Sequence, residues 1–268
     1  MPKKDDNPLF AASEQSAIEA QAPLAVRMRP RTLDEFVGQR HFAGPGQLLR
    51  RMLEADRLMS LIFYGPPGCG KTSLARVIAL QTRSRFCYLS APAAGVKEIR
   101  EITADARARL VGRNPARTLL FIDEIHRFNR AQQDVLLDDV ENGVVTLIGA
   151  TTENPYFSVN SPLISRSTVF QFEPLSIEDI TGLLKRALAD PQRGLGKYKI
   201  DADPEALKLL AVLCDGDARR ALTALEVAAL SLAKSAGNKP VCLTVDAAKE
   251  SVQKKSIQYD GSGDTHYD

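Results

Sequence analysis

The chain has 268 residues, of which 25% are charged, and its formal net charge at pH 7 is only +2. A chain of this length forms one or two domains and can bury a substantial core. The near balance of charge excludes a protein that is basic over its whole surface, so any contact with nucleic acid is expected in a local patch.

The first residues contain no sustained hydrophobic pattern, and we expect a flexible tail over residues 1–22. No long apolar run follows them, which predicts neither a signal peptide nor a membrane span. The cysteines show no C-x-x-C spacing, so reduced thiols in a cytoplasmic protein are expected rather than zinc ligands or disulfides. The cysteines are Cys69, Cys87, Cys214 and Cys242.

Short apolar runs alternate with helical patterns between residues 23 and 173. This alternation is typical of an α/β fold with a parallel sheet. We therefore predict a core domain over residues 23–173. Its expected strands are Leu61–Tyr64, Phe86–Leu89, Thr118–Ile122, Val144–Ile148 and Val169–Phe172.

Strand signals stop after the core, and residues 174–256 are predicted to form a small all-α lid domain. A capping pattern at Ser176 opens a helix that runs to about Leu188. Asp203 followed by Pro204 opens a second helix, with the aspartate as cap and the proline at the first helical position. Two further helical patterns cover Asp217–Ala233 and Thr244–Val252.

Gly65–Thr72 fits the phosphate-binding loop pattern G-x-x-x-x-G-K-[ST] at every fixed position, between a predicted strand and a predicted helix. Glycines let backbone N–H groups turn toward phosphates, and the next helix points its positive end at them. Lys71 is expected to reach the β- and γ-phosphates, and the Thr72 hydroxyl to ligate Mg²⁺. The residues expected to bind the nucleotide here are Gly65, Pro66, Pro67, Gly68, Cys69, Gly70, Lys71, Thr72 and Ser73.

An acidic pair follows the apolar run Thr118–Ile122, which is typical of a central strand covered on both faces. Asp123 and Glu124 stand at its carboxyl end, where parallel strands open toward a bound ligand. We expect Asp123 to hold the Mg²⁺ shell and Glu124 to polarise the attacking water. Together with the phosphate loop, this pair predicts hydrolysis of ATP or GTP.

Five longer stretches carry a more specific signal than the phosphate loop alone. They are Arg27–Pro30, Asp34–Gln39, Gly95–Arg100, Asp123–Asn129 and Gly149–Pro155. From about residue 23 onward, the chain resembles AAA+ ATPases of the clamp-loader clade, and more narrowly the MgsA/RarA/Werner-helicase-interacting family of replication-fork ATPases. The resemblance implies a P-loop AAA+ sheet core with a small all-α lid, ATP bound with Mg²⁺, and ATPase activity.

The resemblance also assigns roles outside the phosphate loop. Val37 and Gly38 match the segment that lines the adenine pocket with backbone groups. Thr152 matches the first sensor, a polar side chain that orients the lytic water, and Asn154 is its rival for that role. Ser90, at a predicted strand end, is a candidate tether that would hold the catalytic glutamate away from the water.

Two arginines are expected to stabilise charge on the γ-phosphate. Arg166 follows Ser165 as in the clamp-loader Ser-Arg-Cys motif, with Ser167 in place of the cysteine, and would insert into the ATP site of a neighbouring subunit. A surface arginine in a salt bridge is the alternative for this position. Arg219 matches the second sensor, which would act from the lid as it closes, and Arg220 is the alternative by one position.

A local basic patch is the expected route to DNA. Lys97 and Arg100 follow the second predicted strand, and three further residues flank the hydrolysis motif. In a ring, such segments face the central channel, where cations meet phosphates, and solvated helix faces are the alternative. Contacts are expected mainly with the DNA backbone, because the basic segments carry few aromatic residues for stacking. The three flanking residues are His126, Arg127 and Arg130.

The end of the chain, residues 257–268, resembles the segment that leads into a C-terminal oligomerisation domain in this family, and we expect that domain to be missing. The resemblance implies a homo-oligomer, tetrameric in the full-length family and weaker in this chain. The implied partners are DNA at a fork or at a junction of single and double strands, and a single-stranded-DNA-binding protein. The implied location is cytoplasmic and nucleoid-associated.

These observations favour a DNA-dependent AAA+ ATPase that acts at stalled or damaged replication forks and remodels DNA or the proteins bound to it. A sliding-clamp loader subunit is the alternative, and a DNA-stimulated ATPase that ignores the clamp would separate the two. A Holliday-junction-type or DExH helicase is a third hypothesis, since Asp123–His126 reads Asp-Glu-Ile-His. A DExH helicase needs a second α/β motor domain, whereas one sheet and a helical lid are predicted.

Overall fold

The computed structural model describes residues 21–112, 115–236 and 241–260, which fold into two compact units. One unit is Pro30–Leu175, and the other combines the described residues before Pro30 with the described residues from Ser176 onward. The described part of the chain therefore contributes to the second unit both before and after the first. Most of the predicted tails, residues 1–22 and 257–268, lie outside the described residues.

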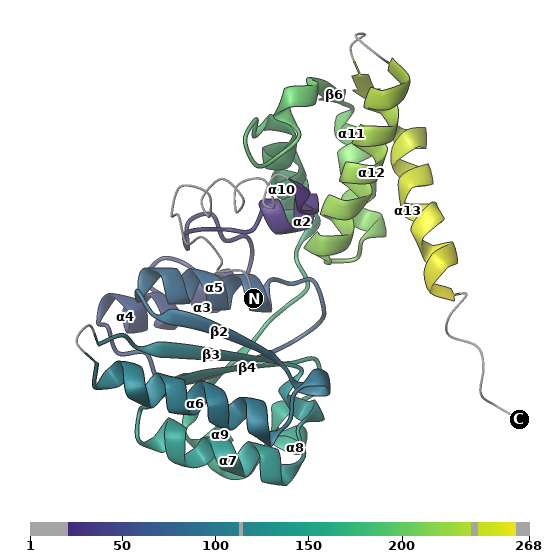
Figure 1. Cartoon of the computed structure of the whole chain (residues 1–268). Coiled ribbons are helices and arrows are strands. Elements are labelled where there is room, and N and C mark those ends of the chain that lie inside the picture. Colours follow the sequence, from purple (N-terminus) through teal and green to yellow (C-terminus); the bar gives the residue numbers. More distant parts are fainter. Residues whose placement is uncertain (1–20, 113–114, 237–240, 261–268) are drawn as a thin grey trace, which may run out of the picture. The chain divides into compact units, whose positions relative to one another are not determined.

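Five parallel strands form the sheet of the first unit, in the order β2-β3-β4-β1-β5. This confirms the predicted α/β class. Strands β2, β3 and β4 are labelled in Figure 1. Because the strands run in one direction, their carboxyl ends meet at one edge of the sheet, and this carboxyl edge is where ligands bind in such folds. The strands are β1 (Ser60–Tyr64), β2 (Arg85–Ser90), β3 (Thr118–Asp123), β4 (Thr146–Thr151) and β5 (Ser167–Gln171).

Helices cover both faces of this sheet (Figure 1). Side chains alternate along β3, so Leu119 and Phe121 pack beneath α3, α4 and α5, while Leu120 and Ile122 pack beneath α6, α7 and α9. A strand that is buried on both faces must be apolar throughout, which is why β3 has the continuous hydrophobic run. The helices and 3₁₀ turns of this unit are α3 (Arg40–Ala43), α4 (Leu48–Glu54), α5 (Lys71–Gln81), η1 (Ala91–Ala93), α6 (Val96–Leu110), η2 (Ile125–Arg127), α7 (Arg130–Glu141), α8 (Pro155–Ser158) and α9 (Ser161–Ser165).

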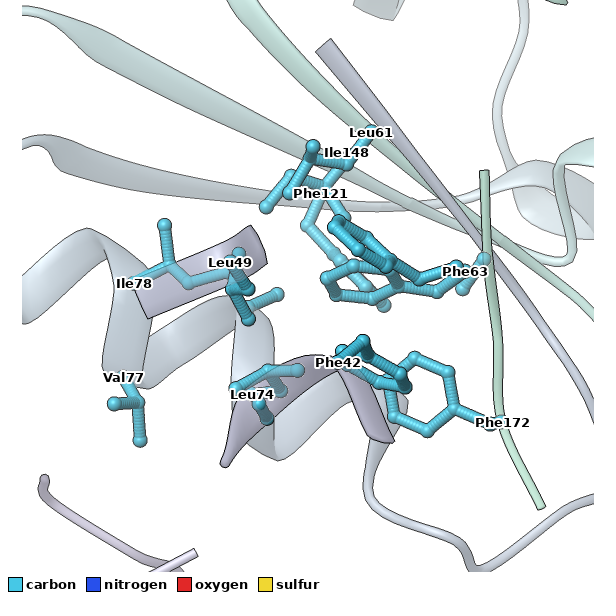
Figure 2. Close-up of a cluster of buried hydrophobic side chains, with 14 of the residues drawn as sticks. Phe42, Leu49, Leu61, Phe63, Leu74, Val77, Ile78, Phe121, Ile148 and Phe172 are labelled. Atoms are coloured by element: carbon cyan, nitrogen blue, oxygen red, sulfur yellow. The ribbon is translucent and has the colours of Figure 1, made fainter. Parts of the chain in front are cut away.

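An aromatic cluster fills the core beneath α5 (Figure 2). The ring of Phe172, just past β5, lies 5.0 Å from the rings of both Phe42 and Phe63, measured between centroids. Leu74 of α5 is fully buried in the same cluster. The packing fixes α5, and with it the phosphate loop, against the strands of the sheet.

Strand β4 differs from its prediction. The expected strand Val144–Ile148 starts two residues too early and stops three residues too early, since β4 is Thr146–Thr151. The N–H groups of Val144 and Val145 bond to the carbonyl of Asp139 and so close α7 instead of joining the sheet. The small residues at the end of β4 pair in parallel register with β1, from Leu61↔Ile148 to Tyr64↔Thr151.

The second unit is mainly helical and contains a short ladder that the sequence did not predict. The three-residue strands β6 (Ile200–Ala202) and β7 (Val241–Leu243) pair in parallel. The prediction that this unit is all-α is therefore wrong. Ser176 and Asp203 cap their helices as predicted. No helix among the described residues has the length and apolarity needed to cross a membrane. The other elements are α10 (Ile177–Ala189), η3 (Gly196–Tyr198), α11 (Pro204–Leu213), α12 (Ala218–Ala236) and α13 (Val245–Asp260).

The segment before the sheet belongs to the helical unit, although a core starting at residue 23 was expected. Its helix α2 (Leu24–Arg27) packs against α12. The N–H of Leu24 donates to Oε2 of Glu226 at 2.9 Å, and Nη2 of Arg27 lies 3.0 Å from Oε1 of the same carboxylate. Arg27 also donates to the carbonyls of Arg193 and Gly194, so one half-buried arginine connects this segment to two parts of the helical unit.

Candidate nucleotide-hydrolysis site

The phosphate loop joins β1 to α5 and depends on three glycines with positive φ. Gly65, Gly68 and Gly70 have φ angles of 151°, 71° and 103°, which L side chains rarely adopt. A Cβ on Gly65 would lie 2.4 Å from the carbonyl oxygen of Phe172, and one on Gly70 would lie 2.9 Å from the Phe36 ring. A side chain is therefore excluded at positions 65 and 70, and an 11-residue helix begins behind the turn, an arrangement that suits a phosphate group.

The Lys71 side chain lies inside this loop and is 8% exposed. Its Nζ donates to the carbonyl oxygens of Gly65 and Pro66, both at 2.7 Å. The Cys69 thiol donates to the same Pro66 carbonyl at 2.9 Å and tightens the turn. Residues 65–73 thus form one continuous loop and helix start, with a buried cation at its centre.

The two predicted metal ligands come from neighbouring elements. Thr72 lies in the first turn of α5, and Asp123 ends β3. The Asp123 carboxylate accepts a hydrogen bond of 3.1 Å from the Tyr88 hydroxyl of β2. Ser90 pairs with Asp123 in the β2–β3 register. Tyr88 was not predicted, because only the register of two strands distant in sequence brings it to Asp123.

A sharp turn follows β3 and points the next residues along the carboxyl edge. Glu124 has a φ of 54°, a left-handed conformation that costs a non-glycine residue about 1 kcal/mol or more and is frequent at functional sites. Ile125, fully buried, anchors the turn. A Cβ on Gly149 would lie 2.9 Å from Cδ1 of both Ile125 and Ile62, so glycine in β4 makes the room that this anchor needs.

Four side chains gather around the Glu124 carboxylate and its turn. Its Oε2 accepts from the Thr152 hydroxyl at 3.4 Å and lies 3.2 Å from Nδ1 of His126. The same Nδ1 lies 2.9 Å from Oγ1 of Thr151, and Nε2 lies 3.5 Å from Oε1 of Glu153. The His126 side chain is 6% exposed, so its predicted contact with DNA is wrong: the ring is buried beside the acidic motif.

The first-sensor alternatives separate by their contacts. Thr152 touches Glu124, whereas Oδ1 of Asn154 accepts from the Tyr156 N–H at 3.1 Å and caps α8. Ser90, the candidate tether, lies beside Asp123 in the sheet register. The structure therefore brings Thr152, rather than Asn154, to the carboxylate that was predicted to polarise water.

The predicted adenine segment lies at the same edge of the sheet. Gly38, next to Val37, has a φ of 76°. The Gln39 side chain donates to the Glu173 carbonyl at 2.7 Å and accepts from its N–H at 2.9 Å. These two bonds fix the segment to the chain leaving β5, where Phe172 also packs against the phosphate loop.

Arg166 lies at the opposite, amino edge of the sheet, immediately before β5. Its Nη2 lies 2.8 Å from Oε1 of Glu141, and Nη1 donates to the Pro162 carbonyl at 3.0 Å and to Oγ of Ser165 at 3.2 Å. The side chain is 42% exposed. Within one chain, Arg166 thus forms a surface salt bridge, which was the alternative expected for this position.

The two sensor candidates of the helical unit stand side by side in the first turn of α12. Arg219 and Arg220 are both exposed. The Asp217 carboxylate accepts from the Arg220 N–H at 2.9 Å and so caps the helix. A cation near a helix amino end is disfavoured by the helix dipole, so the stability of α12 does not explain two arginines here.

Four exposed cations remain as candidates for DNA. Lys97 and Arg100 lie near the start of α6, and the other two lie at η2 and the start of α7. Gln132 of α7 donates to the carbonyl of Ala94 at 3.1 Å, which holds the starts of α6 and α7 together. The cations therefore share one region of the carboxyl edge. The cations at η2 and α7 are Arg127 and Arg130.

Comparison with known proteins assigns the class. Residues 61–175 match the family described as ATPase family associated with various cellular activities (AAA), and residues 196–268 match the AAA C-terminal domain. The structure is similar to that of the Thermotoga maritima RuvB Holliday junction branch migration motor, with a TM-score of 0.69 and 25% identity over 85% of this chain and 73% of that one. The family match and the fold together define an ATP-hydrolysing enzyme of the AAA class.

More similar relatives narrow the assignment. The chain is 45% identical to replication-associated recombination protein A of Escherichia coli (strain K12), over 92% of this chain and 54% of that protein. It is 52% identical to an uncharacterized AAA domain-containing protein of Mycobacterium tuberculosis, over 93% of this chain and 53% of that protein. The chain belongs to the AAA ATPases homologous to replication-associated recombination protein A, which confirms the predicted resemblance. It spans about half the length of these relatives.

Proposed function

We propose that the carboxyl edge of the sheet binds and hydrolyses ATP, with Glu124 as the base that activates water. The contact between Glu124 and Thr152, beside Asp123 and the phosphate loop, is the observation that carries this proposal. Glu124 would accept the proton of the attacking water, and the Thr152 hydroxyl would hold the carboxylate in place. A water held between base and γ-phosphate is the geometry that hydrolysis needs.

The phosphate loop supplies the binding charge. Lys71 would exchange the carbonyl oxygens of Gly65 and Pro66 for phosphate oxygens, which are stronger acceptors for an ammonium group. The Thr72 hydroxyl and the Asp123 carboxylate are oxygen ligands of the kind Mg²⁺ prefers, and they would hold it directly or through water. When bound, Mg²⁺ neutralises charge on the transferred phosphoryl group. Val37 and Gly38 would line the adenine pocket with backbone groups.

Arg166 would complete the site of a neighbouring subunit. The five residues of β1 span about 16 Å at roughly 3.3 Å per residue, so an arginine at the amino edge is remote from its own phosphate loop. Its ion pair with Glu141 is exposed, and such pairs contribute about 1 kcal/mol or less, so a phosphate can outcompete the carboxylate. We propose that the working form is a homo-oligomer and that Arg219 acts as the second sensor from the helical unit.

The biological role that we propose is a DNA-dependent ATPase at stalled or damaged replication forks, in the cytoplasm and at the nucleoid. Homology to a replication-associated recombination protein supports it. The cations near the starts of α6 and α7 support contact with the DNA backbone. A single-stranded-DNA-binding protein remains a candidate partner. The energy of ATP would remodel DNA or a protein bound to it.

Branch migration at four-way junctions is a second candidate, favoured by the similarity to the RuvB motor. The lower identity to that protein, 25% against 45% for the recombination protein, makes it the weaker one. Binding to forked and four-way junction DNA of equal length would separate the two. Tighter binding to the four-way junction would favour branch migration.

The DNA surface is tested by salt-dependent binding of forked DNA. Lys97→Ala, Arg100→Ala and Arg130→Ala should each weaken binding and lower the slope of log K against log salt by about 1, because each loses one phosphate contact. Arg57→Ala is the matched control, since Arg57 is also exposed but precedes β1 at the amino edge. Equal effects at Arg57, or none at the three cations, would contradict this surface.

A further inference from the structure

His126 is a buried histidine inside the acidic motif, and neither the phosphate loop nor the DNA surface uses it. Its ring is held between two carboxylates, with Nδ1 at 3.2 Å from Glu124 Oε2 and Nε2 at 3.5 Å from Glu153 Oε1. Only 6% of the side chain is exposed. A buried polar ring beside a catalytic carboxylate calls for a physical explanation.

The neighbours of Nδ1 determine where its proton lies. Either nitrogen, if unprotonated, would turn its lone pair toward a carboxylate, whereas an N–H would donate to it. Nδ1 is the closer of the two to its carboxylate, and Glu124 is also held by Thr152, whereas the Glu153 side chain is 59% exposed and is screened by solvent. The Thr151 hydroxyl oxygen lies 2.9 Å from Nδ1. The hydroxyl donates its proton to the Glu153 carbonyl at 3.2 Å, and its oxygen accepts from the Glu153 N–H at 3.0 Å. Its oxygen is therefore available to accept from Nδ1 as well. The geometry assigns an Nδ1–H shared between Thr151 and Glu124.

Both side-chain contacts of Glu124 go to the same oxygen. The Thr152 hydroxyl and the His126 ring meet Oε2, which leaves Oε1 to accept a proton from water. The backbone of Thr151 extends this network to the phosphate loop, because its carbonyl accepts from the Gly65 N–H at 3.1 Å. The orientation of Glu124 is thus linked, through His126 and Thr151, to the first residue of the loop.

We propose that His126 is a positioning residue for hydrolysis: its Nδ1–H fixes Oε2 of Glu124 so that Oε1 faces the attacking water. This inference rests on the proposed role of Glu124 as the base. His126 touches neither nucleotide nor water in this scheme, so it should change the rate of the chemical step and leave nucleotide affinity unchanged.

Two substitutions of similar size separate positioning from packing. In His126→Asn, the amide nitrogen takes the place of Nδ1 and can still donate to Glu124. In His126→Gln, the amide nitrogen takes the place of Nε2, and the donor to Glu124 is lost. We expect single-turnover hydrolysis to fall less than about fivefold in His126→Asn and about tenfold to a hundredfold in His126→Gln, the usual loss for a hydrogen bond to a charged group. Affinity for a non-hydrolysable ATP analogue should stay within about twofold for both, since the loop is intact.

A double mutant distinguishes failure of this inference from failure of the proposed function. Glu124→Gln alone should nearly abolish hydrolysis, and adding His126→Gln should cause no further loss because no base remains to be positioned. Equal losses in His126→Asn and His126→Gln, or a further loss in the double mutant, would overturn the role of His126. Near wild-type turnover in Glu124→Gln would instead overturn the proposed base.

The position of the His126 proton can also be measured on the unsubstituted chain, so this test does not depend on whether a variant folds. The chain contains 3 histidines, so nitrogen NMR of histidine-labelled protein can resolve their tautomers. We expect a protonated Nδ1 at His126. An unprotonated Nδ1 would contradict the proposal, because the ring could then not donate to Glu124.

Discussion

Nη2 of Arg166 forms an ion pair of 2.8 Å with Oε1 of Glu141 at the amino edge of the sheet, while Lys71 lies in the loop at the carboxyl edge. Within one chain, the length of the sheet separates this arginine from its own phosphate loop. We therefore propose that the two residues cooperate between subunits, and we expect ATPase activity that depends on protein concentration.

The first prediction is complementation between inactive subunits. Arg166→Ala retains an intact phosphate loop but donates no guanidinium, and Lys71→Ala has a defective loop but an intact Arg166. Each alone should lose at least about tenfold in rate, less than the 10³–10⁵-fold lost when GTPases lack their arginine finger. Mixing the two should restore part of the rate. Glu141→Gln is the control that removes the ion pair but keeps the arginine. No recovery despite demonstrated co-assembly would leave Arg166 as a structural arginine.

The second prediction separates binding from hydrolysis. Lys71→Ala should abolish tight ATP binding, because the phosphates lose their main cation. Glu124→Gln should retain binding and lose turnover, since an amide is not a base. Binding of a fluorescent ATP analogue and phosphate release measure the two steps. A Lys71→Ala protein that binds ATP as the unsubstituted chain does would place the phosphates elsewhere.

The third prediction concerns the helix register of the second sensor. Consecutive helical residues point about 100° apart, so only one of Arg219 and Arg220 is expected to serve. Arg219→Ala should weaken nucleotide affinity and nucleotide-dependent protection from proteolysis, and Arg220→Ala should do less. Neither should lower the unfolding temperature, since a cation in the first turn of α12 opposes the helix dipole. A larger effect on affinity at Arg220 would shift the assignment by one residue.

The fourth prediction concerns the helical unit at acid pH. Burial raises the pKa of Asp190, but the N–H groups of Arg193 and Gln192 and the Arg193 guanidinium lower it more, so its pKa lies below the ordinary value. A depressed pKa contributes stability above the unfolded pKa of about 4, and that contribution is lost as the pH falls through the folded pKa.

Asp190→Ala should therefore cost about 1–3 kcal/mol of unfolding free energy at pH 7, because two backbone donors and an arginine lose a charged acceptor. The cost should shrink as the pH falls below about 4. Asp190→Asn keeps an acceptor oxygen and should lose less. Denaturant unfolding at pH 7 and pH 3 provides the comparison. A cost that does not change with pH would show that the charge of Asp190 has no part in it.

Much of the sheet could be predicted because its strands obey a strong local rule. β3 is apolar throughout, since it is buried on both faces, and its run was visible directly. The predicted start of β4 was too early because Val144 and Val145 continue the apolar pattern of the sequence. Their N–H groups bond to the Asp139 carbonyl of α7 and not to the sheet. The strands β6 and β7 escaped prediction because three residues are too few to show a period.

The site could be predicted in its motifs but not in its contacts. The loop around Lys71 follows from spacing alone, because backbone geometry and charge are local to the motif. His126 was misassigned to DNA, since only the turn at Glu124 shows that its ring is directed into the protein. Tyr88 was missed because its contact with Asp123 depends on the pairing of β2 with β3.

We propose that this AAA site hydrolyses ATP in response to DNA. The most direct test measures steady-state ATPase rates of the chain at several protein concentrations, at low and at physiological salt. Each series is run without DNA and with single-stranded, blunt duplex and forked DNA. The Glu124→Gln variant gives the background rate that is subtracted. We expect a rate that rises with protein concentration and is highest with forked or single-strand/duplex junction DNA, with less stimulation at higher salt. A rate that no DNA changes, at concentrations where DNA is bound, would contradict it.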